Sequence, residues 1–138
     1  MRFTMHPHAH WLGVAGLTPF WGLPLLAGLG LLGIEAAQSA FLAYSAVILS
    51  FLGGIHWYAS VIARPEPTQT YSAMLPSLIA WLALVLLPTG FALVVLALSF
   101  VTLLIYDFRT LSPPPGYWNL RTTLTTVAVI CHGWMALI

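Results

Sequence analysis

The chain has 138 residues, of which 60% are hydrophobic and only 5% are charged, and its mean hydropathy is +0.95. Because about a quarter of the residues of a soluble domain are charged, this composition excludes an ordinary soluble fold and indicates a protein embedded in lipid. A net charge of +1, with no lysine and no basic run, also lacks the electrostatic signature of a nucleic-acid-binding protein.

Five long apolar segments follow one another along the chain, and about 20 such residues cross a bilayer core as a helix. The segments comprise residues 11–32, 38–63, 72–87, 91–106 and 118–138. The first contains Pro19 and Pro24, so we expect it to be a kinked helix. A mass of 15.0 kDa leaves room for one bundle, and the sequence therefore predicts a single all-α transmembrane domain of five helices over residues 1–138.

The basic residues of the chain lie only in alternate connections between these segments, and the other connections contain neither lysine nor arginine. They are Arg2, Arg64, Arg109 and Arg121. Because basic residues near the ends of a span are retained in the cytoplasm, this pattern predicts five crossings with the N-terminus cytoplasmic. We expect an integral protein of a bacterial inner (cytoplasmic) membrane, with Glu35 in the first outer turn.

The second predicted span carries small residues on one helical face, a pattern by which membrane helices pack closely. This stripe consists of Ala46, Ser50, Gly53, Gly54, Trp57 and Ser60. His56 lies at its edge, and an imidazole at this depth needs a hydrogen-bond partner, which Ser60 one turn away could supply. The histidine is either neutral and structural or functional, and the functional alternatives are a cofactor ligand, a proton relay and a quinone contact.

Polar side chains recur at helical spacing on one face of the last predicted span. This face consists of Arg121, Thr125 and His132, together with Ala128. We expect it to point into the bundle, either as a polar lane toward the membrane centre or as hydrogen bonds that hold the helices together. Arg121 lies in the first turn, where its charge opposes the helix dipole and requires an anion. Asp107 at the end of the fourth span is the first candidate, and a lipid phosphate or a bound anionic ligand is the second.

The N-terminal segment contains His6, His8 and His10, a spacing that brings alternate imidazoles onto one side of an extended chain. Three imidazoles without a carboxylate or thiolate are a weak metal signal, so the segment is either a metal site or a solvated lead-in to the first span. We find no nucleophile with an adjacent base, no phosphate-binding glycine loop and no paired carboxylates. The sequence therefore favours a protein that is not an enzyme, and the cofactor stays open between none and a haem or other tetrapyrrole.

Several short strings lie in or beside the predicted spans. They are residues 12–13 (Leu-Gly), 16–20 (Gly-Leu-Thr-Pro-Phe), 51–57 (Phe-Leu-Gly-Gly-Ile-His-Trp), 76–81 (Pro-Ser-Leu-Ile-Ala-Trp), Asp107, 120–121 (Leu-Arg) and 124–125 (Leu-Thr). With these strings the chain resembles, over most of its length, the domain of unknown function 3429 family, and Gly-Gly-Ile-His-Trp is the most specific part. The resemblance implies a small multi-span membrane protein and adds weight to His56, Asp107 and Arg121, but it implies no reaction.

The leading functional hypothesis is a non-catalytic accessory or assembly subunit of a larger membrane protein complex, such as an energy-transducing one. Its partners would be membrane lipid and either other membrane subunits or further copies of this chain, with no nucleic acid. One alternative is a membrane module that uses His56 and His132 to bind haem, another tetrapyrrole pigment or a quinone. The other alternative is a small homo-oligomeric channel or carrier.

Overall fold

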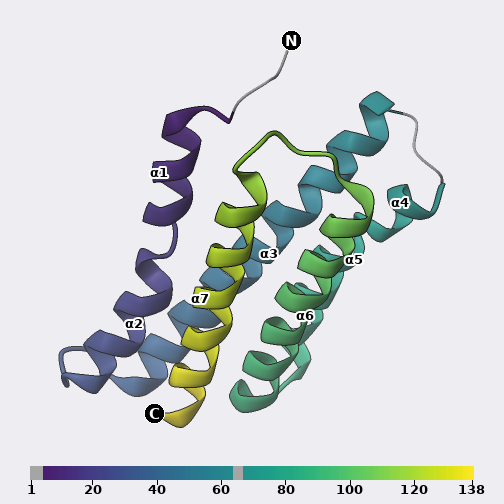
Figure 1. The fold of residues 1–138 in the computed structure, drawn as a ribbon. Helices are drawn as coiled ribbons and strands as arrows, with labels where there is room; N and C mark the ends of the chain where they lie inside the picture. The colour runs from purple at the N-terminus through teal and green to yellow at the C-terminus, as the bar shows by residue number, and fades with distance from the viewer. Residues whose placement is uncertain (1–4, 64–66) are drawn as a thin grey trace.

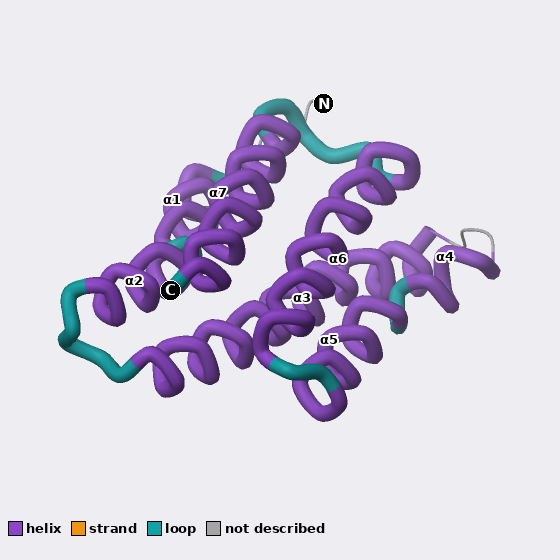
Figure 2. The backbone as a smooth tube through the Cα atoms, turned by 90° about the horizontal axis from the view of Figure 1, so that it is seen from below, coloured by secondary structure: helices purple, strands orange, loops and turns teal. Residues whose placement is uncertain are grey.

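The computed structural model of the protein describes residues 5–63 and 67–138, and within these ranges every regular element is an α-helix (Figure 1). The helices are α1 (Pro7–Ala15), α2 (Thr18–Gly28), α3 (Ile34–Ala63), α4 (Pro67–Ser72), α5 (Leu75–Leu86), α6 (Thr89–Thr110) and α7 (Tyr117–Leu137). The long helix α3 packs against α2, α5 and α6, while α7 packs against α6 and α2. In Figure 2, α3 runs from the group formed by α1, α2 and α7 to the group formed by α4, α5 and α6.

The first apolar segment forms two helices because it is interrupted after Ala15. Pro19, in the first turn of α2, has no N–H to donate to the carbonyl of Ala15 four residues earlier, so one continuous helix would lose a hydrogen bond here. The carbonyl of Gly16 at the break accepts a hydrogen bond of 2.6 Å from the hydroxyl of Tyr44 on α3. The chain therefore changes direction at a point where α3 stabilises it.

The core between α2, α3 and α6 is built from aromatic side chains that are at most 2% exposed. Phe20 packs edge to face against Phe41 and Phe100, with ring centroids 5.4 Å and 6.0 Å apart. Such pairs stabilise a fold by about 0.5–1.5 kcal/mol beyond the burial of their surface. On the other side of α3, a Cβ at Gly53 would lie 3.0 Å from Cγ of Pro76, so this glycine allows α3 and α5 to approach closely.

Among the described residues, four helical segments are long and apolar enough to cross a membrane: Pro7–Gly28, Ile34–Ile62, Pro67–Leu86 and Thr89–Thr110. This finding confirms the prediction of an all-helical membrane protein. The fifth predicted span corresponds to α7, which has 21 residues but is not among the four. Its hydropathy is lowered by Arg121, Thr125 and His132, and all three side chains are buried in the bundle.

Two helix boundaries differ from the predicted spans. Helix α6 continues to Thr110, so Asp107 lies in its last helical turns and not in the connection that follows. Helix α3 begins at Ile34, which places Glu35 in its first turn, where a negative charge is favoured by the helix dipole. In both places a charged residue that looked like part of a loop belongs to a helix end.

Candidate functional site

A buried carboxylate, that of Asp107, joins three helices near one end of the bundle. Asp107 is 1% exposed and lies on α6. Its Oδ1 lies 2.5 Å from Nε2 of His56 on α3, and its Oδ2 accepts a hydrogen bond of 2.9 Å from Nε of Arg121 on α7. Each carboxylate oxygen therefore bonds a different helix, and the charges of Asp107 and Arg121 cancel in an environment of low dielectric.

The second nitrogen of the His56 ring extends this network to α4. The side-chain amide of Gln69 lies 3.2 Å from Nδ1 of His56, and both residues are buried. When the amide donates a hydrogen bond to Nδ1, the ring proton is on Nε2, and Nε2–H donates a hydrogen bond to Asp107. This arrangement is a neutral tautomer of the imidazole. The ring of Tyr106 covers His56 with centroids 4.7 Å apart, so the histidine is enclosed by groups of its own chain.

The guanidinium of Arg121 is only partly paired. Its Nη1 donates to Oγ1 of Thr125 one turn later on α7, and its Nε donates to Asp107. Its Nη2 is buried and has no hydrogen-bond partner among the described residues. A buried donor without an acceptor costs about 1–3 kcal/mol, so this end of Arg121 is a position where an added acceptor would be stabilising.

His132 forms a separate cluster in the aromatic core. Its Nε2 lies 2.7 Å from Oγ of Ser45 on α3, and its Nδ1 lies 2.7 Å from the carbonyl oxygen of Ala128 on its own helix. Phe41 packs against the imidazole with ring centroids 4.8 Å apart, and Phe20 and Phe100 lie near it as well. Both ring nitrogens are thus engaged, and the site links α7 to α3 through a polar contact inside an apolar core.

The two histidines do not form one ligand site. Ser45, which contacts His132, and His56 are eleven residues apart on α3, which is about 16 Å along the helix axis. Two nitrogens bound to one metal at about 2 Å each would lie about 4 Å apart. Because each ring also has both nitrogens hydrogen-bonded, the geometry does not favour the alternative in which His56 and His132 ligate a haem.

The structure brings together four of the residues that the sequence singled out, namely His56, Asp107, Arg121 and Thr125. The suggested role of Ser60 is wrong, since its hydroxyl donates to the carbonyl of Trp57 in the same helix and not to His56. Sequence reasoning missed two partners, which are Gln69 and Ser45. No sequence pattern marked either residue as a partner, because Gln69 lies between two predicted spans and Ser45 lies outside the small-residue stripe of α3.

The small-residue stripe itself divides between the interior and the surface. Ala46 and Gly53 are buried, and Ser50 is half-buried and donates to the carbonyl of Ala46. Gly54 is exposed, and a Cβ added to it would meet no atom within 4 Å. Gly53 thus packs inside this chain against α5, whereas Gly54 is open to a neighbour outside it.

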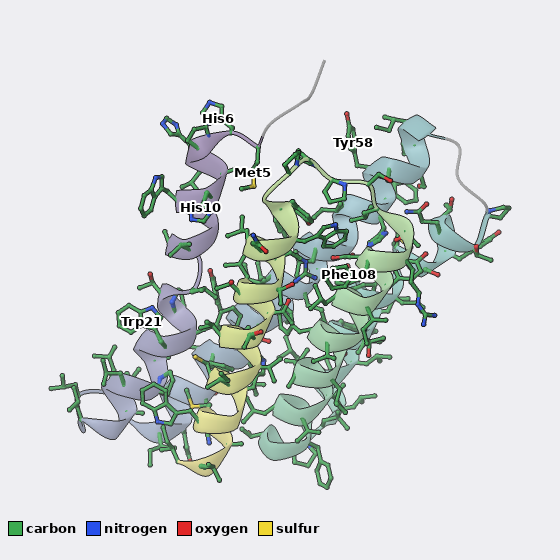
Figure 3. All side chains as sticks on the ribbon, viewed as in Figure 1. Met5, His6, His10, Trp21, Tyr58 and Phe108 are labelled. Carbon is green, nitrogen blue, oxygen red and sulfur yellow. The ribbon has the colours of Figure 1, made fainter. Side chains whose placement is uncertain are left out.

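The N-terminal histidines do not gather into a metal site. His8 and His10 lie in α1 and not in an extended strand, and residues two apart on a helix do not face each other. Nδ1 of His6 accepts a hydrogen bond from the backbone N–H of His8, as the cap of α1. All three are exposed at the start of α1, where Figure 3 labels His6 and His10, and no group of three or more metal-ligating residues occurs in the described ranges.

The fold and the buried ion pair define a small, all-helical transmembrane protein. The chain belongs to the family described as Protein of unknown function (DUF3429), which matches residues 5–137, and the resemblance noted in its sequence is confirmed.

The chain is also similar in sequence to two animal proteins. The chain is 37% identical over 131 residues to Transmembrane protein 69 of Xenopus tropicalis, in an alignment that covers 88% of this chain and 50% of the frog protein. It is 36% identical over 80 residues to Transmembrane protein 69 of Mus musculus, covering 55% of this chain and 33% of the mouse protein. The chain therefore spans about half the length of the frog relative, and no solved structure matches it.

Proposed function

We propose that the protein is a non-catalytic subunit that acts through helix contacts with other membrane proteins in a larger complex. The observation that carries this proposal is the outward face of α7. Thr122, Thr126 and Gly133 are exposed on one side of this helix, and Thr126 bonds its own backbone. Small and hydroxylated residues allow membrane helices to approach closely, so this face suits a protein neighbour.

The outward face of α5 provides the contrast, because all of its exposed residues are large and apolar, whereas α7 exposes threonines and a glycine beside Ile130. Leu78, Trp81, Leu82 and Val85 are exposed there, as large apolar side chains that suit contact with lipid tails. Gly54 on the surface of α3 is a second small position without a neighbour among the described residues. The buried network, by comparison, is satisfied almost entirely by residues of this chain, which supports a structural role for His56 and Asp107 over a catalytic one.

The proposal includes five crossings with the N-terminus in the cytoplasm. Helix α7 rises about 31 Å over its 21 residues, which matches a bilayer core of about 30 Å. Its Arg121, Thr125 and His132 side chains are buried in the bundle, so these three residues do not oppose a membrane position. Figure 1 supports an odd number of crossings, since the start of α1 and the connection from α6 to α7 lie at the top and the C-terminus lies at the bottom.

The basic residues bear on the orientation unequally. Arg109 is exposed in the last turn of α6, at the end of the bundle assigned to the cytoplasm. Arg121 is 3% exposed and paired with Asp107, so its charge contributes less to a positive cytoplasmic surface than the sequence suggested. Arg2 and Arg64 lie outside the described residues.

The partner surface is tested by a double substitution, Thr126→Leu with Gly133→Leu, in the chain expressed in its native membrane. A Cβ at Gly133 would meet no atom within 4 Å, so the fold should tolerate both changes. We expect the protein to shift from a larger assembly to a smaller species on a native gel, while its amount in the membrane stays constant. Gly28→Leu on α2 is the matched control, since Gly28 is also exposed and its Cβ would meet no atom. Unchanged migration of the double variant would contradict the proposal.

A further inference from the structure

A cavity of about 520 Å³ lies between α1, α3 and α7. This volume is within the range of about 300–1,000 Å³ that small-molecule sites occupy. Leu12 on α1 and Phe51 on α3 line it and are 71% and 69% exposed, so the cavity opens between these two helices toward the surrounding lipid. A molecule dissolved in the membrane could enter from the side.

The lining of the cavity is apolar except at one place. Among the described residues, the only polar side chains in it are those of Tyr117, Arg121 and Thr125, all from the first half of α7. The lining continues along α7 to Ala128, about 16 Å from Tyr117 along the helix axis. The cavity thus has three polar side chains on its α7 wall and hydrocarbon on its α1 and α3 walls, which matches an amphiphile with one apolar tail.

Helix α1, on one side of the cavity, has few packing contacts with the rest of the described chain. None of the residues of α1 is buried, and a Cβ at Gly13 would lie 3.4 Å from the side chain of Leu120 on α7. Ala9 and Leu12 of α1 are exposed and line the cavity, so this part of α1 contacts the cavity and not a neighbouring helix. In Figure 3, Met5 marks the upper end of this space, near the start of α7.

The polar side chains on the α7 wall provide hydrogen-bond donors without an excess of charge. Arg121 is 3% exposed, its Nη2 has no partner among the described residues, and a guanidinium has more N–H groups than Asp107 and Thr125 use. Its positive charge is already neutralised by Asp107. A neutral carbonyl oxygen accepts hydrogen bonds from such side chains without adding charge, whereas a carboxylate would add an unbalanced negative charge at low dielectric.

From this combination we infer that the cavity beside α1 binds one neutral amphiphile, with its carbonyl oxygen on the polar α7 wall formed by Tyr117, Arg121 and Thr125 and its single tail along α1 and α3. Two kinds of membrane molecule share this chemistry, a quinone with an apolar tail and a glycerolipid with one ester-linked chain. The inference goes beyond the proposed role as a subunit, because the cavity is on the side of α7 that faces α1 and not on its outward face.

The test is a titration of the purified, full-length protein, followed by native mass spectrometry. The probes are decylubiquinone, 1-monooleoylglycerol and oleate, which present a quinone carbonyl, an ester carbonyl and a carboxylate. We expect saturable one-to-one binding of at least one neutral probe, with oleate at least tenfold weaker. The stronger of the two neutral probes identifies the source of the carbonyl. Failure of both neutral probes to saturate, or tighter binding of oleate, would overturn the inference.

Two variants locate the site. Ala9→Trp places a large side chain at an exposed position that lines the cavity, and Ala40→Trp makes the same change at an exposed position of α3 outside it. We expect at least a tenfold loss of affinity in the first and none in the second. Arg121→Lys keeps the charge but loses the fork of donors, and it should weaken the neutral probe as well. Equal binding by Ala9→Trp and the unmodified protein would overturn the assignment even if the lysine variant does not fold.

Discussion

Nε2 of His56 and Oδ1 of Asp107 lie 2.5 Å apart, between the second half of α3 and the last turns of α6. The same carboxylate bonds Arg121 through its other oxygen, so Asp107 is the common acceptor of two donors from different helices. All three side chains are at most 3% exposed. Substitutions of the three residues should therefore differ in their cost to stability, because each leaves a different number of charged or polar groups unpaired.

Removal of the common acceptor should be the most damaging change. Asp107→Ala leaves the Arg121 charge buried without a counterion and His56 without its acceptor, and we expect a loss of about 3–5 kcal/mol in the free energy of unfolding. Chemical denaturation of the protein in detergent measures this value. Thr102→Ala is the control on the same helix, because Thr102 is exposed and bonds its own backbone. A wild-type midpoint for Asp107→Ala would show that the ion pair does not hold the bundle.

Substitution of the histidine should be milder than substitution of the aspartate. His56→Leu removes the hydrogen bonds to Oδ1 of Asp107 and to the amide of Gln69 but leaves Asp107 paired with Arg121, so we expect a loss of about 1–3 kcal/mol. The same denaturation assay gives the comparison. The order of the two variants is the decisive result, since a larger effect of His56→Leu would place the centre of the network at the histidine.

The adjacent glycines of α3 should respond in opposite ways. Gly53→Ala brings a Cβ to 3.0 Å from Pro76 and 3.1 Å from the carbonyl oxygen of Ala73, and this overpacking should cost about 1–3 kcal/mol. Gly54→Ala meets no atom within 4 Å, and alanine favours the helix by about 0.5–1 kcal/mol, so this variant should be equally stable or slightly more stable. Thermal unfolding of the pair provides the measurement, and equal melting temperatures would contradict the close approach of α3 and α5.

The histidines should not support haem binding. Each ring nitrogen of His56 and His132 already has a hydrogen-bond partner, so ligation would require one of these bonds to break. We expect that haemin added to the purified protein gives no saturable, one-to-one shift of the Soret band. A shift that disappears in His132→Phe or His56→Leu would instead support the tetrapyrrole alternative.

The orientation is open to direct labelling. Cys131 is buried, and Cys131→Ser provides a background without cysteine for single-cysteine variants. A cysteine at Glu35 should react with a membrane-impermeant maleimide only from outside the cell, and one at Ser112, in the connection from α6 to α7, only after the membrane is opened. Labelling of the Glu35 variant solely from the cytoplasmic side would reverse the predicted topology.

Helical periodicity was sufficient to predict which polar residues of α7 are buried. Arg121, Thr125 and His132 share a face at helical spacing, and the structure buries all of them. Asp107 could be named as the partner of Arg121 because the two are predicted on the same side of the membrane, at the ends of consecutive spans. Both predictions depend only on spacing within one helix and on the order of consecutive spans, which can be read directly from the sequence.

Contacts between distant helices could not be read in this way. Ser45 and His132 are 87 residues apart, and the rotation of α3 against α7 decides that they meet. Gln69 becomes a partner of His56 only because α4 turns back toward α3. The break after Ala15 was expected as a kink at the prolines, but its position depends on where Tyr44 of α3 meets the chain.

The order in which the network residues occur in the chain has a consequence for biosynthesis. Asp107 follows His56 by 51 residues, which takes roughly 3–10 s at a synthesis rate of about 5–20 residues per second. His56 has two hydrogen-bonding partners, Gln69 and Asp107. Only Gln69, 13 residues beyond the histidine, is synthesised during this interval. Arg121 follows Asp107 after a further 14 residues. A nascent chain that ends before α7 therefore carries the Asp107 carboxylate without its arginine partner, and the folding of α7 against α6 supplies it.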